Sequence, residues 1–120
     1  MNNQKNVLGT PLQPCSFEPK TGYVRDGFCT CINSDVGQHT VCALMTEEFL
    51  AFSKKAGNDL STPRPEYEFP GLKPGDQWCL CLSRWIEAYE NNAAPYIVLA
   101  STNESVLQHV PIETLQQFDL

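Results

Sequence analysis

The chain has 120 residues and a formal net charge of -6, with 14 acidic and 8 basic side chains. Its length suits one domain, and the negative balance without any basic cluster argues against binding to DNA or RNA. No stretch is apolar enough to span a membrane, and residues 1–6 lack the apolar segment of a signal peptide. We therefore expect a cytoplasmic protein with no nucleic-acid or membrane partner, with a disordered tail over residues 1–6 and a single domain over 7–120.

Proline and glycine dominate the first part of the domain. Between residues 8 and 37 there are three prolines and four glycines, which exclude a long helix. We expect an irregular N-terminal lobe here, with a short strand over residues 23–25. Residues 38–45 form a short apolar run rich in strand-forming residues, although a run of this length is also compatible with a helix.

A helix of about three turns is predicted after this run. Thr46 can cap it, Glu47 and Glu48 complement its positive end, and Gly57 can end it. The next segment, residues 58–77, is so rich in proline and glycine that little regular structure is available to it. Its apolar side chains favour a packed loop over a disordered one.

The segment 77–82 alternates in polarity and favours a strand, although residues 78–89 also contain a helical apolar stripe. We predict a strand over 77–82 and then a helix over 84–92 capped by Ser83. Residues 96–101 are a continuous apolar run typical of a strand, which implies a parallel crossover, and short helices should follow near Asn103 and Pro111. The expected fold is a small α/β or α+β domain, with the irregular lobe followed by β-α-loop-β-α-β-α.

The six cysteines carry the chemistry that the sequence suggests. Without an export signal we expect them to be mostly reduced, and several to be small buried residues. Two Cys-x-Cys pairs, Cys29 with Cys31 and Cys79 with Cys81, could together supply four thiolates to a tetrahedral zinc ion. His39 and Cys42 are another pair of metal ligands, but they face opposite ways on a regular strand.

Two further functions are open. Cys79 and Cys81 precede a predicted helix whose amino end could lower a thiol pKa, and His39 or His109 could act as the base of a thiol-dependent enzyme. Alternatively, the long loop and the following helix could line a cleft for a small ligand or a partner peptide. The candidate ligand-binding residues are Asp59, Asp76, Trp78 and Arg84.

The sequence also resembles a family of uncharacterised, mainly bacterial proteins known as domain of unknown function 2237. The matching stretches are Asn6–Gly9, Pro14–Ser16, Arg25–Gly27, Asp35–Gly37, His39–Cys42, Gly57–Pro63, Phe69–Asp76, Trp78–Cys81 and Arg84–Trp85. The resemblance implies no established reaction or cofactor. Five cysteines sit in matching positions, whereas Cys31 departs from the pattern, so the better candidate metal ligands are His39, Cys42, Cys79 and Cys81.

These observations together predict a protein that binds a small ligand or a metal such as zinc near the second Cys-x-Cys segment. A thiol-dependent enzyme that uses Cys79 or Cys81 is the first alternative. A structural or interaction module with buried free cysteines is the second. The sequence leaves open whether the protein is an enzyme.

Overall fold

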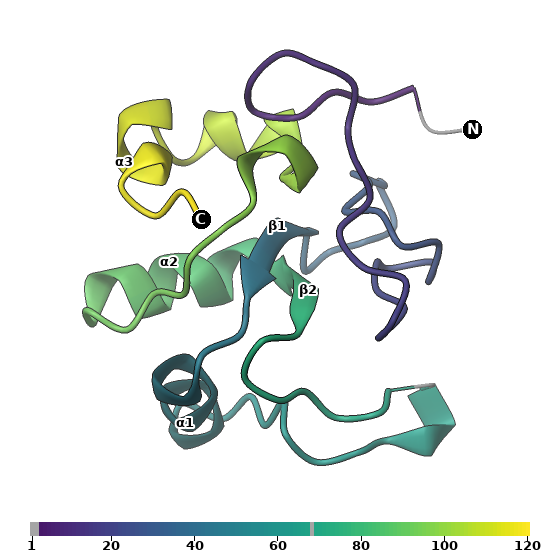
Figure 1. The fold of residues 1–120 in the computed structure, drawn as a ribbon, viewed down its shortest axis with the longest axis vertical. Helices are drawn as coiled ribbons and strands as arrows, with labels where there is room; N and C mark the ends of the chain where they lie inside the picture. Colours follow the sequence, from purple (N-terminus) through teal and green to yellow (C-terminus); the bar gives the residue numbers. More distant parts are fainter. Residues whose placement is uncertain (1–2, 68) are drawn as a thin grey trace.

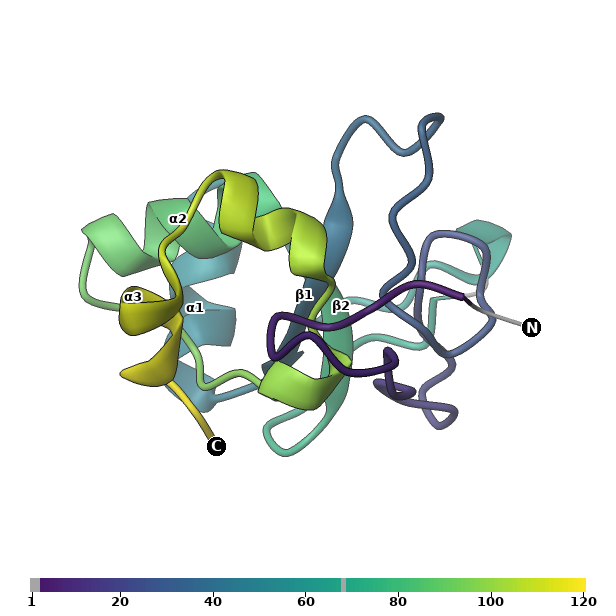
Figure 2. The same ribbon diagram turned by 90° about the horizontal axis from the view of Figure 1, so that it is seen from above.

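A two-stranded antiparallel sheet lies between a group of helices and an irregular N-terminal lobe (Figures 1 and 2). The computed structural model describes residues 3–67 and 69–120 of the chain. The strands are β1, His39–Leu44, and β2, Gln77–Cys81. In Figure 2 the three α-helices lie on one side of these strands, and the lobe formed by residues 12–38 lies on the other.

A helix follows each of the two strands, as expected. The α-helices are α1 (Glu47–Lys55), α2 (Leu82–Glu90) and α3 (Ile112–Gln116), and the 3-10 helices are Pro65–Tyr67, Leu99–Ser101 and Glu104–Gln108. This arrangement confirms the mixed α/β class. None of the helices among residues 3–67 and 69–120 is long and apolar enough to cross a membrane.

The start of α1 is as predicted. The Thr46 hydroxyl accepts a hydrogen bond of 3.1 Å from the backbone N–H of Phe49, and Glu47 and Glu48 occupy the first turn. Phe49, which is fully buried, then anchors the helix in the core. Local sequence signals and tertiary packing agree in this element.

The start of α2 differs from the prediction that Ser83 caps it. The helix begins at Leu82, directly after β2, and its N-cap is Cys81, whose side chain makes no capping hydrogen bond. The physical reason is the buried stripe of Leu82, Trp85 and Ala88, which makes Leu82 part of the first turn. Cys81 therefore ends the strand and caps the helix.

The strand predicted over 96–101, and with it the parallel crossover, is wrong. Ile97 forms only isolated bridges, antiparallel to Ala43 of β1 and parallel to Asp119, and a 3-10 helix follows at Leu99. The hydroxyl of Thr102 donates a hydrogen bond of 2.9 Å to the Val98 carbonyl and closes this turn. The short strand expected over 23–25 is also absent, because these residues form a turn in which Arg25 has a positive φ.

One extra residue in β1 decides which side chains share a face of the sheet. His39 is opposite Cys81 and Val41 is opposite Leu80, so Thr40 has no partner and forms a bulge. Cys42 is opposite Cys79. Because opposing residues share a face and Cys79 and Cys81 are two apart on one strand, the bulge places His39 and these three cysteines on the same face.

The other face of the sheet carries the hydrophobic core. Val41, Ala43, Trp78 and Leu80 belong to the main buried cluster with the helices, whereas the cysteines form a separate cluster on the lobe side. The two faces of the sheet thus have different chemistry, aliphatic and aromatic on one side and sulfur on the other.

The ordered chain begins earlier than residue 7. Asn6 is fully buried, and its carboxamide donates to the Thr10 hydroxyl at 2.8 Å and the Ala100 carbonyl at 2.9 Å. Its backbone pairs with Asn103. The tail expected over residues 1–6 is therefore corrected for Lys5 and Asn6, while residues 1 and 2 lie outside the described part of the chain.

Candidate functional site

Two disulfide bonds join the N-terminal lobe to the sheet. Cys15 is bonded to Cys42 of β1 and Cys29 to Cys79 of β2, and none of the four is more than 6% exposed. This corrects the expectation that the cysteines are mostly free thiols. Spacing along the chain could not reveal these pairs, because the partners are 27 and 50 residues apart.

The two disulfides lie against each other. The sulfur atoms of Cys15, Cys29 and Cys79 are all within 4.8 Å of one another, and Cys42, the bonded partner of Cys15, is directly opposite Cys79 in the sheet. We call these four residues the sulfur cluster. Val98 packs against it, and the cluster is thus a buried group of polarizable atoms.

Cys31 and Cys81 remain as free thiols. Cys31 is exposed, and Gln4 holds its backbone through hydrogen bonds to both its N–H, at 2.7 Å, and its carbonyl, at 2.8 Å. It is not one of the residues gathered around the buried sulfur atoms. The two Cys-x-Cys pairs therefore do not form the four-thiolate site that their spacing allows.

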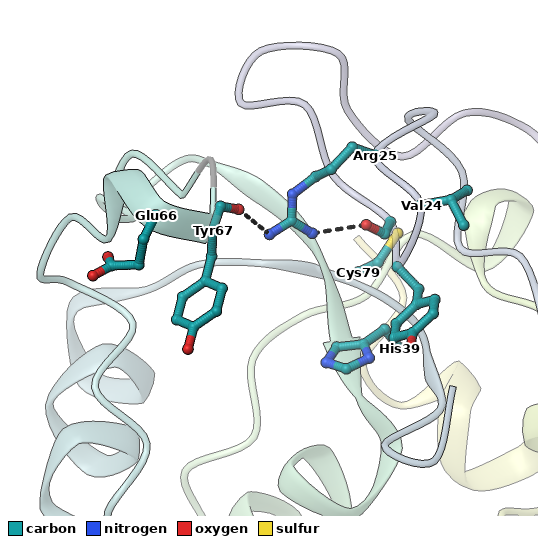
Figure 3. A pocket seen from close by; sticks show the side chains of 8 residues that line it. Val24, Arg25, His39, Glu66, Tyr67 and Cys79 are labelled. Atoms are coloured by element: carbon teal, nitrogen blue, oxygen red, sulfur yellow. Dashed lines mark hydrogen bonds between the residues drawn. The ribbon is translucent and has the colours of Figure 1, made fainter. Parts of the chain in front are cut away.

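A cleft opens beside the sulfur cluster (Figure 3). Its volume of about 790 Å³ is within the range of small-molecule sites. The lining combines a guanidinium, an imidazole, a carboxylate, two phenol rings and one cysteine of the sulfur cluster. The residues are Gly22, Tyr23, Val24, Arg25, His39, Glu66, Tyr67 and Cys79.

Arg25 is held in this cleft by an unusual backbone. Its φ is 57°, a conformation that costs free energy for a side chain of this type and is often found at functional sites. The guanidinium donates to the carbonyls of Gly22, at 2.8 Å, and Tyr67, at 3.3 Å, as Figure 3 shows. It also lies 5.0 Å from the centre of the Trp78 ring. The charge is thus held in place by carbonyl oxygens and an aromatic face.

His39 is fixed by one buried carboxylate. One oxygen of Asp35 lies 2.8 Å from the ring Nδ1 of His39, and the other accepts a hydrogen bond of 2.8 Å from its backbone N–H. The Asp35 side chain is only 1% exposed, and the Tyr23 ring stacks on the imidazole at 6.2 Å between centroids. With Nδ1 engaged, Nε2 is the nitrogen left for chemistry.

Cys81 is close to this pair. Its thiol donates a hydrogen bond of 2.8 Å to the Gly37 carbonyl and lies 3.3 Å from the Ser83 hydroxyl. A Cβ added at Gly37 would lie 3.0 Å from Cε1 of His39 and 3.5 Å from the Cys81 sulfur. Both groups therefore border the same small space over Gly37, in which a larger residue would crowd them.

The four predicted metal ligands share a face of the sheet, but two of them are in disulfide bonds and two are not. Cys42 and Cys79 belong to the disulfides, whereas His39 and Cys81 lie opposite each other at the far end of the strands. A regular strand would have turned His39 away from Cys42. The bulge at Thr40 removes this obstacle, and no sequence pattern indicated that bulge.

The four predicted ligand-binding residues are dispersed among local contacts. Trp78 is buried, and the Arg25 guanidinium lies over its ring. Asp76 accepts from the Lys73 backbone N–H at 2.9 Å, and Arg84 pairs with Glu87 at 3.2 Å. Asp59 closes a turn, in which a hydrogen bond from the Thr62 hydroxyl, and then one from the Ser61 N–H, hold its pKa below the ordinary value of 3.8.

Most of the residues that line the cleft, and Asp35 beside them, were missing from the sequence prediction. Asp35 stands four residues before His39, a spacing that could have indicated a pair. Arg25 and Tyr23 lie between Gly22 and Gly27, and two glycines this close together could have indicated a turn in place of the expected strand.

The domain is thus a mixed α/β unit that carries a sulfur cluster beside a polar, aromatic cleft. Over residues 5–119 it matches the family model described as an uncharacterized protein conserved in bacteria, DUF2237, and the chain belongs to that family. The resemblance noted from the sequence is confirmed. A comparison with curated proteins finds no match.

Proposed function

We propose that this domain binds a small molecule in the cleft beside the sulfur cluster. The observation that carries the proposal is the placement of Arg25, whose strained backbone and two carbonyl contacts hold a guanidinium at the cleft wall. Such strain persists only where the surrounding structure maintains it, and it is concentrated at ligand-binding and active sites.

The chemistry of the lining favours a ligand with an anionic group and a flat ring. Among residues 3–67 and 69–120, the hydrogen bonds of the Arg25 guanidinium end on carbonyl oxygens, which orient its charge without neutralising it. Tyr23 and Tyr67 are 46% and 70% exposed, and their rings offer surfaces for stacking. Glu66 adds an acceptor at the rim, which favours a ligand that also carries a donor.

Benzoate is a simple probe of this chemistry. The matched control compounds are phenol, which lacks the carboxylate, and acetate, which lacks the ring. In an NMR titration, benzoate should shift the signals of Tyr23, Arg25, His39 and Tyr67. Phenol and acetate should each bind at least about fivefold more weakly. Arg25→Asn removes the charge, and asparagine tolerates a positive φ. This variant should lose benzoate binding, whereas Arg84→Gln, outside the cleft, should retain it. Equal binding by Arg25→Asn would contradict the proposal.

A second candidate function, thiol chemistry at Cys81, is supported by the neighbouring Asp35–His39 pair. Cys79 is engaged in a disulfide, so Cys81 is the free thiol of its Cys-x-Cys segment. In this mechanism Nε2 of His39 takes the thiol proton, and the buried Asp35 carboxylate stabilises the imidazolium that forms.

Alkylation with iodoacetamide near pH 7 tests this mechanism, with Cys31 as an internal control. Cys81 should be alkylated faster than Cys31 although it is less exposed. His39→Gln should slow the alkylation of Cys81 and leave that of Cys31 unchanged. If Cys81 reacts more slowly than Cys31 and does not respond to His39→Gln, His39 does not activate it.

A further inference from the structure

We propose that the sulfur cluster becomes a zinc site when its two disulfides are reduced, with Cys15, Cys29, Cys42 and Cys79 as the four ligands. The proposal is independent of the cleft ligand. It rests on the separation of the sulfur atoms, the burial of the four cysteines and the way two strands fix two of the ligands. The proposal concerns the protein under reducing conditions, in which both disulfides are open.

Three of the four sulfur atoms lie at separations near those of a tetrahedral site, and Cys42 reaches it through its partner Cys15. Zinc binds thiolates at about 2.3 Å, so the four sulfur atoms of such a site are about 3.8 Å apart. Three sulfur atoms of the cluster already lie within 4.8 Å of one another. The Cα atoms of the bonded pairs are 5.7 and 5.2 Å apart, so small side-chain rotations suffice to open each pair around an ion.

The backbone fixes the ligands before any metal arrives. Cys42 and Cys79 are opposite each other in the sheet. The backbone N–H of Cys42 bonds to the Thr102 hydroxyl at 3.1 Å, and that of Cys79 to the buried Thr21 hydroxyl at 2.8 Å. Two of the four ligands are thus held on rigid strands, which lowers the entropy that metal binding must overcome.

The redox balance is simple. Each disulfide takes up two electrons and two protons to give two thiols, so two equivalents of a dithiol reductant, each oxidised to its own disulfide, supply the four electrons. The four thiols then release four protons as they bind one zinc ion. Two equivalents of a disulfide oxidant reverse the process: each takes up two electrons and two protons to become a dithiol, the two protein disulfides form, and the zinc is released.

The centre carries two negative charges when four thiolates surround one zinc ion, and burial of this charge is unfavourable unless a cation is near. Arg25 supplies a cation on the cleft side, because its guanidinium and Cys79 line the same cavity. Val98 packs against the sulfur atoms and limits the access of water. Thiolates in such an environment suit a soft or borderline ion such as zinc better than calcium or magnesium.

His39 and Cys81 are the competing ligands, since they share the face of Cys42 and Cys79. They lie at the end of the strands, however, where His39 is already engaged by Asp35 and the Cys81 thiol by Gly37. The lobe supplies Cys15 and Cys29 in their place. Substitution can separate these two ligand sets directly.

The test uses the full chain, reduced without oxygen by a phosphine, and mixed with zinc or cobalt(II). Native mass spectrometry should find one zinc per reduced chain and none on the oxidised chain. The cobalt form should show the intense absorption of four thiolates in a tetrahedral field. This spectrum needs no variant, so a variant that fails to fold does not remove the test.

Substitution then assigns the ligands. Cys15→Ser and Cys29→Ser should each weaken zinc binding roughly 100-fold, whereas the controls Cys31→Ser, Cys81→Ser and His39→Gln should bind as the wild type does. Three results would each overturn the proposal: reduced wild-type protein that binds no zinc, a cobalt spectrum with nitrogen ligands, or loss of binding in Cys81→Ser or His39→Gln.

Discussion

Cys42 and Cys79 lie directly opposite each other in the antiparallel pair, and each is bonded to a different cysteine of the N-terminal lobe. The lobe contains no helix or strand among residues 12–38, and its backbone meets the rest of the domain at single hydrogen bonds, such as that from the Gln13 N–H to the Ala100 carbonyl at 3.0 Å. The two disulfides add covalent attachment to these contacts. They also position the turn that carries Arg25, and the cleft depends on them for that reason.

Loss of either disulfide should therefore destabilise the oxidised protein strongly. From the lengths of the closed loops, paired alanine substitution of Cys15 and Cys42 should cost roughly 3.5 kcal/mol, and that of Cys29 and Cys79 roughly 4 kcal/mol. Denaturant unfolding of the oxidised protein measures both. The exposed Cys31→Ala should change the free energy of unfolding by less than about 0.5 kcal/mol. A disulfide variant as stable as this control would show that the lobe is held by other contacts.

Asn6 is a second attachment between the start of the chain and the end of the domain. Its buried carboxamide bridges Thr10 and Ala100, so Asn6→Ala removes these contacts and takes the acceptor away from the N–H groups of Leu8 and Thr10. The expected cost is about 2–3 kcal/mol in the free energy of unfolding. Asn3→Ala, at an exposed position, should have little effect, and equal costs for the two would contradict the role of Asn6.

The loop over residues 58–77 should tolerate little change where its backbone approaches itself. A Cβ at Gly71 would lie 2.6 Å from the Ser61 carbonyl oxygen, whereas one at Gly75 would meet nothing within 4 Å, and both glycines have positive φ. Gly71→Ala should thus cost at least about 1 kcal/mol more than Gly75→Ala, because only Gly71 adds a steric clash to the strain. Thermal unfolding of the two variants gives the comparison. Equal costs would mean that the loop moves freely away from Ser61.

The turn at Asp59 should weaken in acid. Its pKa is lowered in the folded protein, chiefly by the Thr62 hydroxyl, so the carboxylate stabilises the fold above its ordinary pKa of 3.8 and this contribution is lost as the pH falls below that value. An NMR titration of Asp59 should give a pKa below 3.8, and Thr62→Val should raise it. A pKa unchanged by Thr62→Val would rule out the hydroxyl as the main cause.

The elements with strong local signals were predictable from the sequence. The α1 cap at Thr46, the strand at Gln77 and the irregular character of the lobe follow from capping chemistry, alternation and proline content. The run at 96–101 was not, because its apolar residues are buried by a bridge and a 3-10 turn and not by a ladder of strands. Hydrophobic periodicity indicates which residues are buried, but burial alone does not determine whether the backbone forms a strand or a 3-10 turn.

The candidate site was only partly predictable, since it depends on contacts between distant segments. The sequence indicated that Cys42, Cys79 and His39 belong together. It could not reveal the bulge at Thr40 that aligns them, nor the pairing with Cys15 and Cys29, because tertiary packing determines both. The same limit hid Arg25, whose importance comes from the backbone of a turn.

The pairing of the cysteines is the central claim, because the lobe, the cleft and the proposed zinc site all depend on it. Mass spectrometry of proteolytic peptides from the oxidised protein, with free thiols blocked beforehand, tests it most directly. The structure predicts crosslinked peptides containing Cys15 with Cys42 and Cys29 with Cys79, and blocked thiols at Cys31 and Cys81. A crosslink that includes Cys31 or Cys81, or blocking groups on all six cysteines, would contradict the account.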